Sequence, residues 1–220
     1  MYQFIMVKKI SLIVTCFLIT IGSYAQTARS LYINMPDSLN QLLTKSNRED
    51  FADFMDSKMK AEVQNRFNAN SDMKELTTDY LLVQTTKVST FQMKVLTMPD
   101  STRIICAVKT FYGPVADSEI HFYNTKWHEL SDSNYVHVPE QSDFLTSVDT
   151  TQEEAYIDAT SAISMDFIKA DLSSKDNSLS FTYTSPETLC KEDLAKLSPF
   201  LKKDPVILYW DVKSGKFVKK

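Results

Sequence analysis

The sequence predicts an α+β fold in which an antiparallel sheet, built from a meander plus hairpins, is covered on one side by N-terminal and C-terminal helices. Three observations support this prediction. Apolar residues recur at helical spacing as far as residue 63, and from residue 79 onward they alternate with polar ones. The alternating segments are joined by short connections rich in turn residues, which favour antiparallel pairing. Helical spacing returns most clearly after residue 185.

The first 25 residues have the features of a secretory signal peptide. Lys8 and Lys9 precede an apolar run over 10–21, and the small residues Ser23 and Ala25 stand at the −3 and −1 positions of a cleavage site. The run is shorter than the roughly 20 apolar residues that cross a bilayer. We therefore expect export, cleavage near Ala25, and a periplasmic or secreted mature protein with no membrane span.

Removal of 25 residues would leave 195 of 220, with 22 basic against 28 acidic side chains and a net charge of −6 instead of −4. This acidic balance argues against nucleic acid and anionic lipid as partners, because both bind basic patches. The length suits a single α+β domain over 26–220, with 26–130 and 140–220 as alternative halves. The spacing does not decide whether these halves share one sheet.

Helical patterns occupy the first third of the mature chain. Asp37 or Ser38 is a natural N-cap for a helix whose apolar face contains Leu39, Leu42 and Leu43. The pattern restarts at 47 as an amphipathic helix, and its apolar face consists of Phe51, Phe54, Met55, Met59 and Val63. We expect these helices to rest on an apolar surface.

Segments with a period of two predict the strands. The ranges 81–84, 91–95, 104–110 and 119–123 form a four-stranded meander. The range 128–162 is polar and irregular, with a short helix around 151–162. Strands over 167–172 and 179–183 precede a helix that starts near Ser185, and a hairpin of 206–210 and 216–218 turns over Ser214 and Gly215.

The scarcity of glycine excludes several classes of site. After cleavage only Gly113 and Gly215 remain, whereas phosphate-binding loops, dinucleotide fingerprints and nucleophile elbows need clustered glycines. The histidines His121, His128 and His137 share no helix face and have no cysteine or carboxylate at zinc spacing. We therefore predict no catalytic, metal-binding or cofactor-binding residue and no cofactor.

One short pattern resembles a catalytic motif. Ser57 and Lys60 match the S-x-x-K pattern of penicillin-recognising enzymes, in which the lysine activates the serine for attack on an acyl group. However, Ser57 falls on the predicted solvent face of its helix. The downstream residues Lys213, Ser214 and Gly215 are explained by a hairpin turn, so we do not assign this activity.

Two cysteines remain after cleavage. Cys106 lies within an apolar strand pattern, and Cys190 lies near the start of the last predicted helix. Two cysteines are too few for a disulfide scaffold. They form either one disulfide or two free thiols, in which case Cys106 packs as a small apolar residue.

Aromatic residues gather near the end of the fourth predicted strand. Strand alternation turns Phe122 toward the core and Tyr123 toward solvent, and Tyr112 and Trp127 lie nearby in the sequence. Exposed Tyr and Trp side chains are typical anchors of recognition surfaces. Tyr112, Tyr123 and Trp127 are therefore candidate interaction residues, with packing in the core or at its rim as the alternative.

Several segments of the chain resemble a family of small exported proteins from Gram-negative gut bacteria. The residues that carry the resemblance include Met35-Pro36-Asp37-Ser38-Leu39, Asp53-Phe54-Met55-Asp56-Ser57-Lys58-Met59-Lys60-Ala61 and Ala116-Asp117-Ser118-Glu119-Ile120-His121-Phe122-Tyr123. That family is catalogued as a domain of unknown function. The resemblance covers nearly the whole mature chain and implies export and a single domain, but no active site.

The order of helices followed by a meander is also similar to small periplasmic modules related to β-lactamase-inhibitor-type folds. Those domains bind proteins or peptides over a sheet face. We therefore expect a non-enzymatic exported module that binds an envelope protein or peptide on a sheet face. The alternatives are a hydrolase of envelope polymers with an unrecognised site, which needs a deep pocket with a perturbed acid or base, and an assembly factor that forms a homo-oligomer.

Overall fold

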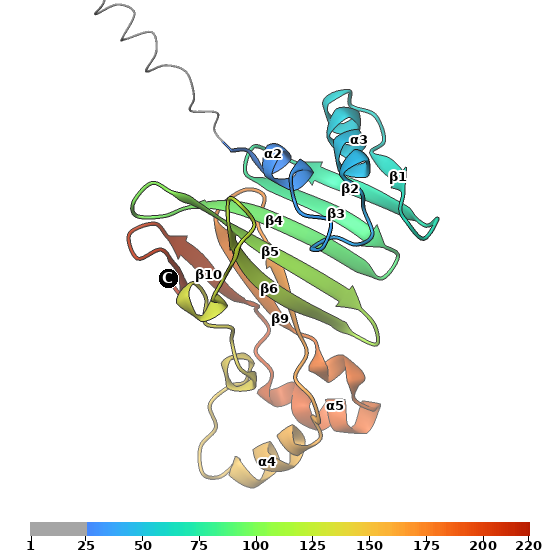
Figure 1. Ribbon diagram of the computed structural model, residues 1–220. Coiled ribbons are helices and arrows are strands. Elements are labelled where there is room, and N and C mark those ends of the chain that lie inside the picture. Colours follow the sequence, from blue (N-terminus) through green and yellow to red (C-terminus); the bar gives the residue numbers. More distant parts are fainter. Residues whose placement is uncertain (1–25) are drawn as a thin grey trace, which may run out of the picture.

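The computed structural model describes residues 26–220, so the predicted signal peptide over 1–25 lies outside the described residues. Across this range no helix has the length and apolar character needed to cross a membrane. The chain contains helices and two antiparallel sheets (Figure 1). The α-helices are α2 (Ala28–Ile33), α3 (Lys45–Asp56), α4 (Glu153–Ser161) and α5 (Lys191–Leu197).

The larger sheet has seven strands that follow one another in chain order, each antiparallel to the next. Because the strands form a continuous meander, the β1–β2, β3–β4 and β5–β6 turns all lie at the same end of the sheet. The strands are β1 (Glu62–Gln64), β2 (Asn70–Leu76), β3 (Tyr80–Thr86), β4 (Ser89–Thr97), β5 (Arg103–Tyr112), β6 (Ala116–Asn124) and β7 (Glu129–Leu130). The predicted four-stranded meander is therefore the centre of a wider sheet.

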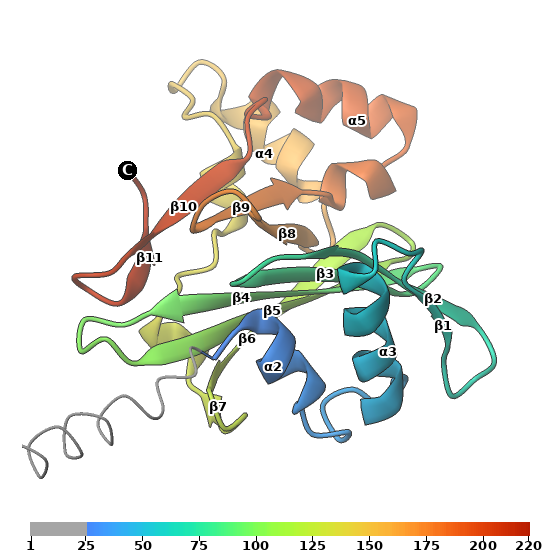
Figure 2. The ribbon, with the colours of Figure 1, turned by 90° about the horizontal axis from the view of Figure 1, so that it is seen from above.

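The N-terminal helices pack on one face of this sheet (Figure 2). Strand alternation presents residues such as Val83, Met93 and Ile105 to this face, where they share a buried cluster with Leu31 and Phe51. The Tyr32 ring also stacks on Phe91, with 5.9 Å between the ring centroids. The helices stay in place because their apolar sides complete this core.

Helix α3 is shorter than the sequence pattern predicts. It begins with a capping box between Thr44 and Asn47 and ends at Asp56. Lys58 then has a φ of 54°, in the left-handed region, which stops the helix. Val63, predicted to lie on the helix, is instead a buried residue of strand β1.

The opposite face of the large sheet meets a second sheet of four strands in the order β11-β10-β9-β8. These strands are β8 (Ile168–Leu172), β9 (Ser178–Tyr183), β10 (Val206–Asp211) and β11 (Lys216–Val218). The predicted halves therefore contribute separate sheets. The core between them includes Cys106, Phe122 and Trp210.

Strand β8 is an edge strand whose outward N–H groups bond to side chains of the large sheet. The N–H of Leu172 donates to Gln92 Oε1 at 2.8 Å, and that of Ala170 donates to Ser118 Oγ at 2.9 Å. The N–H of Ile168 donates to Asp117 Oδ1 at 3.1 Å. These acceptors close an edge that would otherwise be open to other chains, and they fix β8 across the large sheet.

The placement of the C-terminal helix differs from the prediction. Helices α4 and α5 pack together around Leu145, Ala159 and Leu197, apart from the face that α2 and α3 cover (Figure 2). The helix predicted from Ser185 is also divided, because α5 starts only at Lys191 after a 3-10 turn. Helices from both ends of the chain therefore do not cover the same side of one sheet.

The two cysteines of the described chain are free thiols. Cys106 is fully buried between the two sheets, and Cys190 is exposed at the start of α5. Of the two alternatives left by the sequence, the disulfide is therefore wrong. Burial raises the pKa of the Cys106 thiol, so this residue behaves as an inert part of the core.

Candidate functional site

Two of the three predicted interaction residues are not accessible. Tyr123 is 5% exposed and Trp127 is 7% exposed, and their rings lie 5.4 Å apart in the core beneath the N-terminal helices. The indole N–H of Trp127 donates to the carbonyl of Leu31 in α2 at 3.1 Å. Strand alternation does turn Tyr123 away from Phe122, but the face it points to is covered, so the prediction that Tyr123 and Trp127 are exposed is wrong.

Tyr112, the third predicted residue, lies in an exposed apolar surface at the hairpin end of the large sheet. It is 40% exposed, its neighbour Phe111 is 48% exposed, and Val88 in the β3–β4 turn is 57% exposed. The N–H of Tyr112 donates to the carbonyl of Val88 at 2.9 Å, which holds the two turns together. We call Val88, Phe111 and Tyr112 the hairpin-end surface. Phe111 points to the side of the sheet that α2 and α3 cover, and Tyr112, the next residue of the strand, points to the other side.

A groove of about 330 Å³ opens beside the hairpin-end surface, between the loop over 38–42 and strands β3 to β5. Its apolar lining comes from Leu39, Leu42 and Phe111, and its polar lining includes Ser89 and Lys109. A mainly apolar hollow with a few polar groups is the usual form of a binding site. We call it the Phe111 groove, because that residue belongs to both features.

A buried arginine fixes the loop that forms one wall of the Phe111 groove. The Arg48 side chain is 1% exposed, and its guanidinium donates to the carbonyls of Leu43 and Met35, each at 2.6 Å. It also donates to the carboxylate of Asp37 at 3.0 Å. Because these bonds hold both ends of the loop, the groove is preformed.

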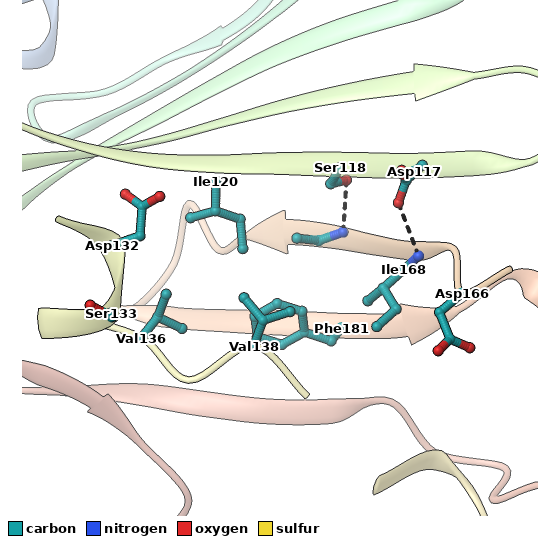
Figure 3. A pocket seen from close by; sticks show the side chains of 11 residues that line it. Asp117, Ser118, Ile120, Asp132, Ser133, Val136, Val138, Asp166, Ile168 and Phe181 are labelled. Atoms are coloured by element: carbon teal, nitrogen blue, oxygen red, sulfur yellow. Dashed lines mark hydrogen bonds between the residues drawn. The ribbon is translucent and has the colours of Figure 1, made fainter. Parts of the chain in front are cut away.

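A second groove, of about 390 Å³, lies between strand β6, strands β8 and β9, and the segment over 132–138 (Figure 3). Apolar side chains such as Ile120, Val136 and Phe181 line its centre. The carboxylates of Asp117, Asp132 and Asp166 surround these apolar side chains. We call this hollow, with its apolar centre and its three aspartates, the inter-sheet groove.

The Ser57 and Lys60 pair lacks the geometry of a nucleophile and its base. Ser57 is the exposed C-cap of α3, and Lys60 forms a salt bridge with Glu62. The hydrogen bond with Glu62 raises the pKa of Lys60, whereas a lysine base needs a lowered pKa. The motif is thus part of a helix end.

The histidines do not gather at one place. His121 lies 3.1 Å from Glu129 across the β6–β7 ladder, and His128 and His137 are exposed. Within residues 26–220 no group of three histidine, cysteine or acidic side chains is placed to hold a metal ion.

Comparisons with known proteins identify relatives of the whole fold. A search of curated proteins found no match. Among solved structures, the chain is similar to a domain of an uncharacterized protein from Porphyromonas gingivalis W83, with a TM-score of 0.76 and 27% sequence identity over 87% of this chain and 96% of that one. Residues 20–217 match the family described as "Protein of unknown function (DUF3256)". Because this match covers most of the sequence, the chain belongs to the DUF3256 family.

Proposed function

We propose that the chain is a non-enzymatic module that binds a protein or peptide partner through the hairpin-end surface and the Phe111 groove. The observation that carries this proposal is the continuity of the two features through Phe111, which is half exposed and lines the groove. Aromatic residues beside a preformed apolar hollow are typical of the centre of an interface. The proposed interaction thus moves from a sheet face to the hairpin end of the large sheet, where Phe111 lies on the side that α2 and α3 occupy and Tyr112 lies on the other side.

The groove indicates the kind of partner segment. Its volume of about 330 Å³ and its lining of leucine and phenylalanine side chains suit one or two apolar side chains of the partner. The exposed side chain of Gln41 lines the same hollow, and it can bond to the partner's backbone. We therefore propose an exposed peptide segment with an apolar anchor as the occupant.

The proposed place of action is the bacterial envelope or the exterior. This part rests on the sequence alone, through the basic residues, apolar run and small residues of 1–25. Its test is the intact mass of protein recovered from the periplasm or medium of the native organism. Removal of residues 1–25 agrees with the proposal, and an unprocessed chain in the cytosol contradicts it.

Affinity capture from solubilised envelope of the native organism tests the binding itself. The double variant Phe111→Ser/Tyr112→Ser should lose a partner that the unchanged chain retains, because each interface anchor contributes roughly 2 kcal/mol, or about 30-fold in affinity. Ile157→Ser/Met165→Ser is the matched control, since it removes two exposed apolar side chains elsewhere. Equal retention by both double variants would contradict the proposal.

A further inference from the structure

The inter-sheet groove runs beside an open stretch of the edge of β6. Strand β7 pairs with β6 only at Phe122 and Tyr123. On the same edge, the Phe122 N–H donates to Asp132 Oδ1 at 3.2 Å, and the Ala116 carbonyl accepts from Thr184 Oγ1 at 2.6 Å. At both ends of the stretch, at Ala116 and at Phe122, the backbone polar groups therefore point away from β5.

Ser118 and Ile120 lie between Ala116 and Phe122 at steps of two residues, so their backbone groups point in the same direction. Their backbone N–H and C=O groups face away from β5, and they have no strand partner within residues 26–220. Both residues line the inter-sheet groove. An open edge beside a groove is the geometry in which an extended peptide adds a strand to a sheet.

The charged residues that line the groove are all acidic. Asp132 stands at one end, and Asp117 and Asp166 stand at the other, with apolar side chains between them (Figure 3). The lining residues include no lysine, arginine or histidine. A ligand that places positive charges at both ends and an apolar group between them would therefore match the lining.

The carboxylates are held in place by the protein's own donors. Asp117 accepts from the Ile168 N–H at 3.1 Å, and Asp166 Oδ1 accepts from the Tyr183 hydroxyl at 2.7 Å. Each bond uses one oxygen of the carboxylate, and a carboxylate can accept further hydrogen bonds at the other. The acceptors for a cationic group are thus preoriented.

We propose that the inter-sheet groove binds an extended, lysine- or arginine-bearing peptide as an added strand on the edge of β6. The peptide backbone pairs with Ser118 and Ile120, its apolar side chain rests on the centre of the groove, and its basic side chains meet the aspartates at the two ends. This site goes beyond the proposed function, because it uses none of the residues of the hairpin-end surface.

The spacing along β6 sets the length of the peptide. Asp117 and Phe122, to which Asp132 is bonded, are five residues apart, which is about 17 Å along a strand. Two basic residues four positions apart point to the same side of a strand and span about 14 Å before their side chains extend. The blocked pentapeptide Lys-Thr-Val-Thr-Lys is therefore a suitable probe.

The test is a titration of the ¹⁵N-labelled chain, expressed from its complete coding sequence, with this pentapeptide. The amides of Ser118 and Ile120 should shift and exchange more slowly with solvent, because they become paired. The peptide Glu-Thr-Val-Thr-Glu, the matched control of opposite charge, should not bind. N-methylation of the valine amide should weaken binding at least tenfold, because it removes a donor that pairs with β6.

Protein variants separate the charge from the backbone pairing. Asp117→Asn and Asp166→Asn each keep an oxygen for their internal donors, and each should weaken the basic peptide by about threefold to fivefold, as expected for exposed ion pairs. Asp204→Asn, an exposed aspartate outside the groove, and Val88→Ser, in the hairpin-end surface, should leave the affinity unchanged.

Three results would overturn the proposal. They are no binding of the basic peptide at millimolar concentration, equal binding of the acidic peptide, and shifts that leave the Ser118 and Ile120 amides untouched. Val88→Ser shows whether the peptide binds the hairpin-end surface instead of the inter-sheet groove. Failure of this proposal is therefore distinct from failure of the proposed function, which is tested by capture of a partner at the hairpin-end surface.

Discussion

One buried glutamine bonds the large sheet to strand β8, and its replacement should destabilise the whole chain. Gln92 in β4 is 4% exposed. Its Oε1 accepts from the Leu172 N–H of β8 at 2.8 Å, and its Nε2 donates to Asp171 Oδ1 at 3.0 Å. The change Gln92→Leu removes both bonds, together with a longer bond of 3.4 Å that the Tyr80 hydroxyl donates to Oε1, and puts an apolar side chain of similar size in their place.

The two lost bonds to β8 have different costs. The Leu172 N–H is buried, and a buried donor without an acceptor costs about 1–3 kcal/mol. The bond to Asp171 contributes less, because that side chain is 35% exposed and water can replace the amide. We expect a loss of roughly 2–3 kcal/mol in the free energy of unfolding, which lowers Tm by roughly 4–12 °C in a domain of this size.

Urea denaturation followed by circular dichroism measures this loss, with Gln152→Ala as the control. Gln152 is exposed and makes no side-chain capping bond at α4, so its change should stay within about 0.5 kcal/mol. Gln92→Glu keeps the acceptor for Leu172 but faces Asp171 with a second negative charge. The free energy of unfolding that Gln92→Glu loses should therefore become smaller as pH falls and one carboxyl gains a proton. If Gln92→Leu unfolds at the same urea concentration as Gln152→Ala, the bond between Gln92 and the Leu172 N–H does not stabilise the fold.

Three further predictions concern single residues. Arg48→Met leaves two buried loop carbonyls without their donor, so it should lower the free energy of unfolding by about 3 kcal/mol in urea denaturation. A loss below about 1 kcal/mol would show that the loop keeps its conformation without these bonds. In a thiol titration of the folded chain from 26 onward, Cys190 should react and Cys106 should react only after unfolding; two reactive native thiols would contradict the burial of Cys106. The hydrogen bond from Lys219 lowers the pKa of Asp143, so this pair stabilises the fold above the unfolded pKa of about 4 and is lost as pH falls through the lower folded value. Lys219→Met should make thermal stability less sensitive to acid between about pH 5 and 2, and an unchanged pH dependence would contradict this assignment.

Local patterns predict the centre of the fold because they report which side chains alternate. The strands around Met93, Ile105 and Phe122 are apolar on both faces, since helices cover one face and the second sheet covers the other. Strand β2 was not predicted because its sequence is mostly polar. Of its seven residues only Ser71 and Met73 are buried, and a bulge after Met73 breaks the alternation.

The candidate site shows what a single sequence cannot convey. Alternation correctly places Tyr123 opposite Phe122, but only the tertiary structure shows that α2 covers that face. Tyr112 was identified from its proximity in the sequence to Phe122 and Tyr123, and it is exposed. Phe111 was not singled out, because a strand residue in an apolar segment usually points to the core. The inter-sheet groove joins residues some 50 positions apart, such as Asp117 and Ile168, so no local pattern predicts it.

Site-specific photocrosslinking tests the central claim, that a partner binds at the hairpin-end surface. A photoreactive phenylalanine analogue is placed at Phe111 or at Val88, and at the equally exposed Ile157 as the control, in the native organism. We expect one crosslinked partner from the positions of Phe111 and Val88 and none from that of Ile157. No adduct at the two hairpin-end positions, or the same adduct at Ile157, would contradict it.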